Sequence, residues 1–208
     1  MKRILTALGI GMAGITGTVS ADEGRYGKYE SPRYEVVRQI GGAELRTYAP
    51  QLLAVVAVEG DRSSAMSRGF RVLAGYIFGG NSGSAQVAMT SPVTQRSIEI
   101  DMTAPVTQSG SDDIWEVTFM MPSEFQRSTL PRPNNAAIRF VDVPERQMIV
   151  LTFSGRTPAR VLDSKVAELA QILEASSHRA VGDPIFMFYD DPFTLPMNRR
   201  NEVGFVVQ

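Results

Sequence analysis

Apolar residues follow an alternating or continuous pattern in the first part of the fold. Such runs are typical of strands, and they predict three of them, at Tyr34–Ile40, Glu44–Tyr48 and Leu52–Val58. Gly41-Gly42 and Pro50 lie between these runs, where turn residues are expected. The fold is therefore predicted to begin with closely connected strands.

A helical spacing follows these strands. Apolar residues recur every three or four positions after Asp61 or Ser63, either of which is a suitable N-cap. The helix is predicted to run from Arg62 to Phe78 and to end at the loop Gly79-Gly80-Asn81. Its apolar stripe faces a core or a ligand and consists of Met66, Phe70, Leu73, Ala74, Ile77 and Phe78.

Two nearly identical heptads come next, Met89-Thr-Ser-Pro-Val-Thr-Gln95 and Met102-Thr-Ala-Pro-Val-Thr-Gln108. Around each heptad apolar residues alternate with polar ones, which is the spacing of a half-buried strand. The alternation predicts that Pro92 and Pro105 point to solvent, at an edge or a bulge, because proline cannot donate to a ladder. With a further strand at Trp115–Met121, the segment is predicted to form an antiparallel meander.

The order strand, strand, helix, strand then occurs a second time. Strands are predicted at Ala137–Val143, Met148–Phe153 and Ile185–Tyr189, and a helix at Pro158–Ala175 with Thr157 as its capping residue. The helix of each unit can pack across one face of a curved antiparallel sheet. We therefore predict an α+β fold, a distorted antiparallel β-barrel with two flanking α-helices, built from a duplicated strand-strand-helix-strand unit.

Residues 1–21 have the features of a secretory signal peptide. Two basic residues precede the apolar or small run Ile4–Val19, and a small-x-small cleavage pattern ends at Ala21. An uncleaved membrane anchor is the alternative, but the run is diluted by glycine and short for a span of about 20 residues. We expect an exported, periplasmic protein without stable membrane insertion after cleavage, with a flexible leader at 22–33 and one domain at 34–208.

Composition excludes several classes of function. Without Lys2 and Arg3, 19 basic residues face 22 acidic ones, so a net-negative mature chain is not expected to bind nucleic acid. The chain has no cysteine, which excludes disulfides, thiol catalysis and cysteine-based zinc sites. The oligomeric state is not indicated by the sequence.

Candidate chemistry is sparse. His178 is the one histidine of the chain, so neither a catalytic triad nor a histidine metal cage is supported; it is a surface titrating residue or one axial haem ligand. The loop Gly79–Gly83 follows a helix and lacks the ending of a phosphate loop. Asp112-Asp113 and Asp190-Asp191 are better explained as turns than as cation sites. The ten methionines are more typical of core filling than of haem ligation.

Several motifs in order resemble the SOUL haem-binding protein family. They are the two heptads, Phe119-Met-Met-Pro-Ser-Glu-Phe125, Phe153-Ser-Gly155 and the ending Tyr189–Val203, and the resemblance runs from about Tyr34 to the C-terminus. It implies a distorted barrel with two helices and non-covalent, non-catalytic binding of haem or a related tetrapyrrole. The implied binding site is a shallow apolar groove between the first helix and the loop 190–198.

The resemblance also implies individual roles. Arg68 takes the position of the arginine that pairs with a propionate, and Val72, Gly75 and Tyr76 share its helix face. Tyr76 and Thr194 replace two further basic groups of some relatives, for which Arg71, Arg199 or Arg200 are candidates to compensate. The iron-binding histidine of one branch has no counterpart. The expected apolar wall of the groove consists of Phe193, Leu195 and Met197, stiffened by Pro192 and Pro196.

Three functions remain open at this point. The first is a haem or tetrapyrrole carrier, buffer or scavenger. The second is an interaction module or a sensor of another amphipathic small molecule without haem, with the loop 190–198 simply closing the barrel. The third is a hydrolase, for which no base and nucleophile are evident. In each case the run Arg199–Glu202 is expected to form surface ion pairs.

Overall fold

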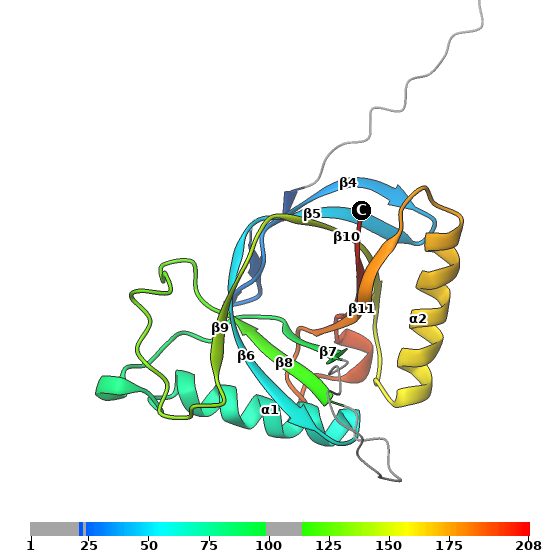
Figure 1. Ribbon diagram of the computed structural model, residues 1–208. Helices are drawn as coiled ribbons and strands as arrows, with labels where there is room; N and C mark the ends of the chain where they lie inside the picture. Colours follow the sequence, from blue (N-terminus) through cyan, green and yellow to red (C-terminus); the bar gives the residue numbers. More distant parts are fainter. Residues whose placement is uncertain (1–20, 23, 99–113) are drawn as a thin grey trace, which may run out of the picture.

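The computed structural model describes residues 21–22, 24–98 and 114–208 (Figure 1). The predicted second heptad and most of the predicted signal peptide lie outside these residues. The first half contains β1 (Ala21–Asp22), β2 (Arg25–Tyr26), β3 (Tyr29–Glu30), β4 (Tyr34–Ile40), β5 (Ala43–Tyr48), β6 (Gln51–Glu59), α1 (Arg62–Ile77), β7 (Val93–Ile98) and β8 (Ile114–Met120). The second half contains β9 (Arg139–Val143), β10 (Arg146–Phe153), α2 (Ala159–Glu174), β11 (Ala180–Phe188) and β12 (Asn201–Val207), and short 3-10 turns lie at Ser82–Ser84 and Pro196–Asn198.

Ten strands form one strongly curved antiparallel sheet. Its order is β1-β4-β5-β10-β12-β11-β7-β8-β6-β9, so the hairpins β11–β12 and β7–β8 lie beside each other at the centre. Outward from this centre, β10 and β5 on one side correspond to β6 and β9 on the other. The repeated unit is therefore strand-strand-helix-strand-strand, one strand longer than the sequence predicted. The pairing leaves β1 and β9 as edges, so the predicted α+β class holds while a closed barrel is not confirmed.

The two helices lie on the outer face of the sheet, each over its own pair of strands (Figure 1). Under α1, which packs on β6 and β8, a core forms around Leu73, Ile77, Val117 and Phe119. Under α2, which packs on β10 and β12, a second core forms, with Leu162, Leu169, Ile149, Val203 and Phe205 among its members. A third apolar cluster lies apart from the two helices and consists of Tyr48, Met148, Val150, Ile185, Met187 and Tyr189.

The two helices begin with different N-cap residues. The Asp61 carboxylate accepts hydrogen bonds from the Ser63 and Ser64 amides, which satisfies two of the free donors at the start of α1. At the start of α2 the N-cap is Pro158, without a side-chain cap. The predicted capping role of Thr157 is therefore wrong; its carbonyl accepts a hydrogen bond from the Arg62 guanidinium instead, at 3.2 Å.

The described heptad differs from the expected strand. Its strand, β7, begins only at Val93, and Pro92 is buried rather than exposed. The reason is that neighbouring segments cover residues 90–92: the Ser91 amide donates to the Glu30 carbonyl and the Ser91 hydroxyl to the Tyr189 carbonyl. Pro92 precedes the ladder, so its missing N–H costs no ladder bond.

The leader is ordered from Gly24 onward. β2 and β3 form a small hairpin whose Tyr26 hydroxyl donates to Asp190 at 2.8 Å. The Glu30 carboxylate accepts from the Ser123 amide at 3.0 Å. Residues 24–33, where the sequence suggested a flexible leader, therefore form hydrogen bonds to the segments around Asp190 and Ser123.

Candidate ligand-binding site

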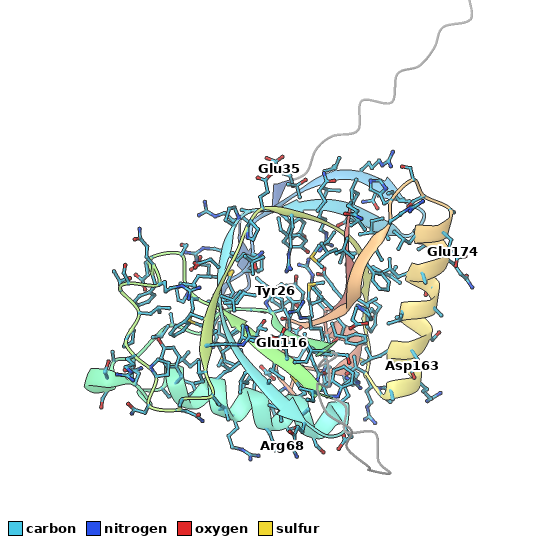
Figure 2. The ribbon with its side chains drawn as sticks, viewed as in Figure 1. Tyr26, Glu35, Arg68, Glu116, Asp163 and Glu174 are labelled. Carbon is cyan, nitrogen blue, oxygen red and sulfur yellow. The ribbon has the colours of Figure 1, made fainter. Side chains whose placement is uncertain are left out.

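The exposed face of α1 carries the predicted anion-pairing residue. Arg68 is exposed and donates to the Glu59 carbonyl, at the junction of β6 and α1. Figure 2 places Arg68 on the side of α1 remote from the sheet. Arg71 is exposed on the same helix, one turn further along. Two guanidinium groups thus border this face.

Gly75 makes the middle of this face flat. A side chain built on Gly75 would have nothing within 4 Å, so the space above it is open. Phe78, at the end of the helix, is 68% exposed and gives the face an apolar end. The Gly80 amide donates a hydrogen bond of 2.8 Å to the Gly75 carbonyl, and this bond closes the end of the helix. A flat apolar molecule can lie over Gly75 with its acidic groups toward the arginines.

Val72 and Tyr76 belong to the inner side of the helix. Val72 is partly buried against the α1 core. Tyr76 is 1% exposed, contacts the Phe140 ring and donates its hydroxyl to the Pro131 carbonyl at 3.0 Å. Tyr76 therefore supports the helix from below, and its side chain is not available on the exposed face.

The loop 190–198 is rigidly held yet exposes its apolar side chains. The Asp191 carboxylate accepts from the amides of Phe193 and Thr194, which confirms the predicted turn. The Arg199 guanidinium donates to the Thr194 and Pro192 carbonyls. Thr194 is half-buried, and its backbone is held by these hydrogen bonds. The apolar side chains on either side of it are exposed, Phe193 by 95%, Leu195 by 60% and Met197 by 70%.

The predicted residues thus form two exposed surfaces, one on α1 and one on the loop. Within the described residues, the hydrogen bonds of the loop run to its own residues and to Tyr26, Gly155, Arg199 and Arg200, and none reaches α1. Large apolar side chains with this much exposure are uncommon on a soluble surface and mark binding sites when they cluster. The loop therefore qualifies as a binding surface by its own geometry.

The concave face of the sheet holds a charged network that the sequence did not predict. Glu202 is completely buried and accepts hydrogen bonds from Arg46, Arg200 and the Tyr189 hydroxyl. The ion pair expected in the run Arg199–Glu202 forms between Arg200 and Glu202, but its carboxylate is buried rather than at the surface. Alternation along β12 turns Val203 to the outer core and Glu202 inward. Arg200 is two residues from Glu202 in the sequence, but Arg46 comes from the distant strand β5, so no local motif shows it.

This network is tightly coupled electrostatically. Burial alone lowers the pKa of Arg46, but neighbouring Tyr48 and Glu202 outweigh it and raise the pKa above its ordinary value. Burial raises the pKa of Tyr189 well above its ordinary value. Burial, together with the hydrogen bond to Asp190, raises the pKa of Tyr26 to about 12. Arg200, stacked 4.3 Å from the Tyr189 ring, is part of this interior and cannot serve a surface ligand.

The described part of the chain offers little to a metal ion. It holds no group of three His, Cys, Asp or Glu side chains placed to bind a metal ion. His178 lies in the turn after α2, half-buried, and its Nδ1 has no hydrogen-bond partner. Among the helices formed by residues 21–22, 24–98 and 114–208, none has the length and apolar character needed to cross a membrane.

A curved antiparallel sheet with two outer helices, a buried charged network and exposed apolar surfaces places the chain among α+β domains. The family model described as SOUL heme-binding protein matches residues 29–206. The chain belongs to this family. Mouse heme-binding protein 2 is a relative, 29% identical over 175 residues that cover 81% of this chain and 79% of the mouse protein.

Solved structures share the fold. The C-terminal domain of EcmrR superposes with a TM-score of 0.59 at 13% identity, covering 80% of this chain and 96% of that domain. A structure described as a hydrolase from Listeria innocua gives a TM-score of 0.55 at 12% identity, covering 83% of this chain and 94% of that one. At such identities the likeness concerns the fold alone.

Proposed function

We propose that the protein binds haem or a related tetrapyrrole non-covalently and without catalysis, as a carrier, buffer or scavenger. The observation that carries this proposal is the family match over residues 29–206. The mouse relative named for haem binding supports it. The surfaces described above fit an amphipathic planar ligand, which needs apolar contact for its ring and cations for its two carboxylates.

Different residues would contact the ring and the propionates of a bound haem. The apolar side chains of the loop 190–198 supply contact for the macrocycle, and the open space above Gly75 admits a flat ring. Arg71 and Arg68 would pair with the propionates. Arg68 would first have to give up its hydrogen bond to the Glu59 carbonyl. Bound haem would supply its iron for ligand or redox chemistry, and the described surfaces offer no histidine to it.

A haemin titration tests the proposal. The Soret band is expected to shift and saturate at one equivalent. Arg68→Ala should weaken binding about two- to fivefold, as expected for an exposed ion pair. Arg160→Ala is the matched control, because Arg160 is exposed near the start of the equivalent helix α2. A wild-type spectrum that does not change with haemin would reject the proposal.

The apolar wall is tested separately. Phe193→Ser should weaken haemin binding about tenfold or more, because burying a phenyl ring is worth roughly 1.5–3 kcal/mol. Val181→Ser removes another exposed apolar side chain, 46% exposed at the far end of β11, and should leave binding unchanged. Equal losses in the two variants would show nonspecific adsorption of haemin.

A second candidate is a sensor or interaction module for another amphipathic small molecule. Arg68 is already hydrogen-bonded within the chain, and Tyr76 and Thr194 stand where some relatives place cations, which favours a less acidic ligand. Clean folding combined with a flat haemin response supports this candidate. We also propose signal cleavage after Ala21 and export to the periplasm, which the mass of the mature chain and cell fractionation test.

A further inference from the structure

Three neighbouring hollows lie along the 120–127 segment, outside the surfaces considered so far. Its first hollow, about 280 Å³, lies between the leader hairpin and Pro122-Ser123. A second hollow of about 190 Å³ shares Glu30, Arg33 and Pro122-Ser123 with the first. A third of about 460 Å³ shares residues 50–52 and Phe125 with the second. Neighbouring hollows share lining residues and are therefore adjacent, and the row of three is called the furrow below.

One end of the furrow is cationic. Arg25, Lys28 and Arg33 line it, and within the described residues none of them forms an ion pair. The neighbouring acid, Glu30, has its carboxylate on the Ser123 amide. This concentration of positive charge occurs on a chain whose net charge is −1, so it is a local feature.

The rest of the furrow is mostly apolar. Its middle is lined by Leu52, Met120, Met121 and Phe125, together with prolines. At the far end the Arg127 and Asp142 side chains pair with each other at 2.8 Å, so their charges cancel. A ligand that fits has an anionic head for one end and an apolar tail for the remainder.

We propose that this furrow binds a long-chain carboxylate. A carboxylate head suits the guanidinium groups of Arg25 and Arg33, which pair with it through two parallel hydrogen bonds. A single unbranched chain suits a narrow furrow with proline and methionine walls. Gly24–Lys28 precede residue 29, where the family match begins, and no α1 residue lines the furrow. The site is therefore independent of the proposed haem surfaces.

Calorimetric titration with decanoate, dodecanoate and dodecanol, each below its micelle concentration, tests the proposal. Each added methylene should tighten binding, by up to about fourfold where it is fully buried. Dodecanol, which has the same tail and no charge, should bind at least about threefold more weakly than dodecanoate. Equal affinity for the alcohol and the carboxylate would overturn the assignment.

Charge reversal locates the head. Lys28→Glu and Arg33→Glu should each weaken dodecanoate binding about three- to tenfold, while Arg160→Glu on α2 should leave it unchanged. Arg33 lies against Gly24, so Lys28→Glu, at the exposed hairpin turn, is the variant that keeps the test clear of folding defects. Affinity unchanged in Lys28→Glu and Arg33→Glu would overturn the proposal.

The same variants separate this site from the haem surfaces. Lys28→Glu should leave haemin binding unchanged, and Phe193→Ser should leave dodecanoate binding unchanged. Loss of both ligands in either variant would mean one shared site and would overturn the proposal. A wild-type chain that binds dodecanoate but not haemin rejects the proposed function and supports the furrow.

Discussion

Glu202 is the residue on which the concave face depends most. Its side chain is completely buried, and its two oxygens are shared by Arg46 and Arg200. Two buried or half-buried cations need this carboxylate, because a buried charge without a partner is costly. The ion network therefore has its largest consequence when one member is removed.

Glu202→Gln should lower the free energy of unfolding by roughly 3–5 kcal/mol, since Arg200 loses its counter-charge and the buried Arg46 keeps only the partly exposed Glu44. Urea denaturation at pH 7 measures the change. Asp142→Asn is the matched control: Asp142 is 69% exposed in its pair with Arg127, and its loss should cost less than about 1 kcal/mol. Similar costs for the two variants would contradict a buried, coupled network.

The helix α1 owes its close approach to the sheet to one glycine. A side chain built on Gly69 would come within 2.6 Å of the Val117 side chain on β8. Val117 is itself completely buried. The absence of a side chain at Gly69 therefore sets the distance between α1 and β8, and with it the position of the exposed helix face.

Gly69→Ala should destabilise the protein by about 1–3 kcal/mol, because overpacking outweighs the gain in helix propensity. Gly75→Ala is the matched control on the same helix and should stabilise by up to about 1 kcal/mol, since the space around Gly75 is open. Thermal or urea unfolding measures both. Stabilisation by Gly69→Ala would show that α1 does not pack as described.

The molecule as a whole is stabilised by two outer apolar cores and by an interior in which the ion network lies beside a third apolar cluster that contains tyrosines. Tyr48 and Tyr189 lie buried within the concave network, and Tyr76 lies buried under α1. Buried phenols favour their neutral form, so the fold opposes their ionisation. Alkaline pH therefore acts on the α1 core and on the interior at once.

Burial raises the pKa of Tyr76 from 10.0 to about 12. A group with a raised folded-state pKa contributes its full stability below pH 10 and loses it as pH rises toward 12. Wild-type stability should fall over this window, with up to about 3 kcal/mol due to Tyr76. Tyr76→Phe should lose correspondingly less between pH 8 and pH 11 in urea denaturation. An identical loss in wild type and variant would contradict this assignment.

Much of the fold follows from local sequence pattern. The spacing of apolar residues predicts β4, β5, β6 and both helices nearly to their ends, because a periodic apolar face must be buried wherever the chain turns. The duplication is also visible in the order of elements. The expectation for Pro92 failed because burial there comes from the docked leader, which the strand's own alternation cannot reveal.

The candidate site, like the fold, could be predicted from the sequence only in part. Sequence motifs identify the family and select the residues of α1 and of the loop 190–198. They do not show that Tyr76 turns into the core, that Arg68 is held by the Glu59 carbonyl, or that Glu202 is buried among arginines. Those facts depend on contacts between segments far apart in the chain.

The sequence by itself determined the strands and helices near their observed places, the α+β class and the family, because these depend on local periodicity and on ordered motifs. Tertiary structure alone decided which charges lie inside the curved sheet, which apolar side chains stay in water, and how the leader hairpin adds cations to a furrow. The physical reason is that burial and charge neutralisation are properties of surroundings that distant strands assemble together.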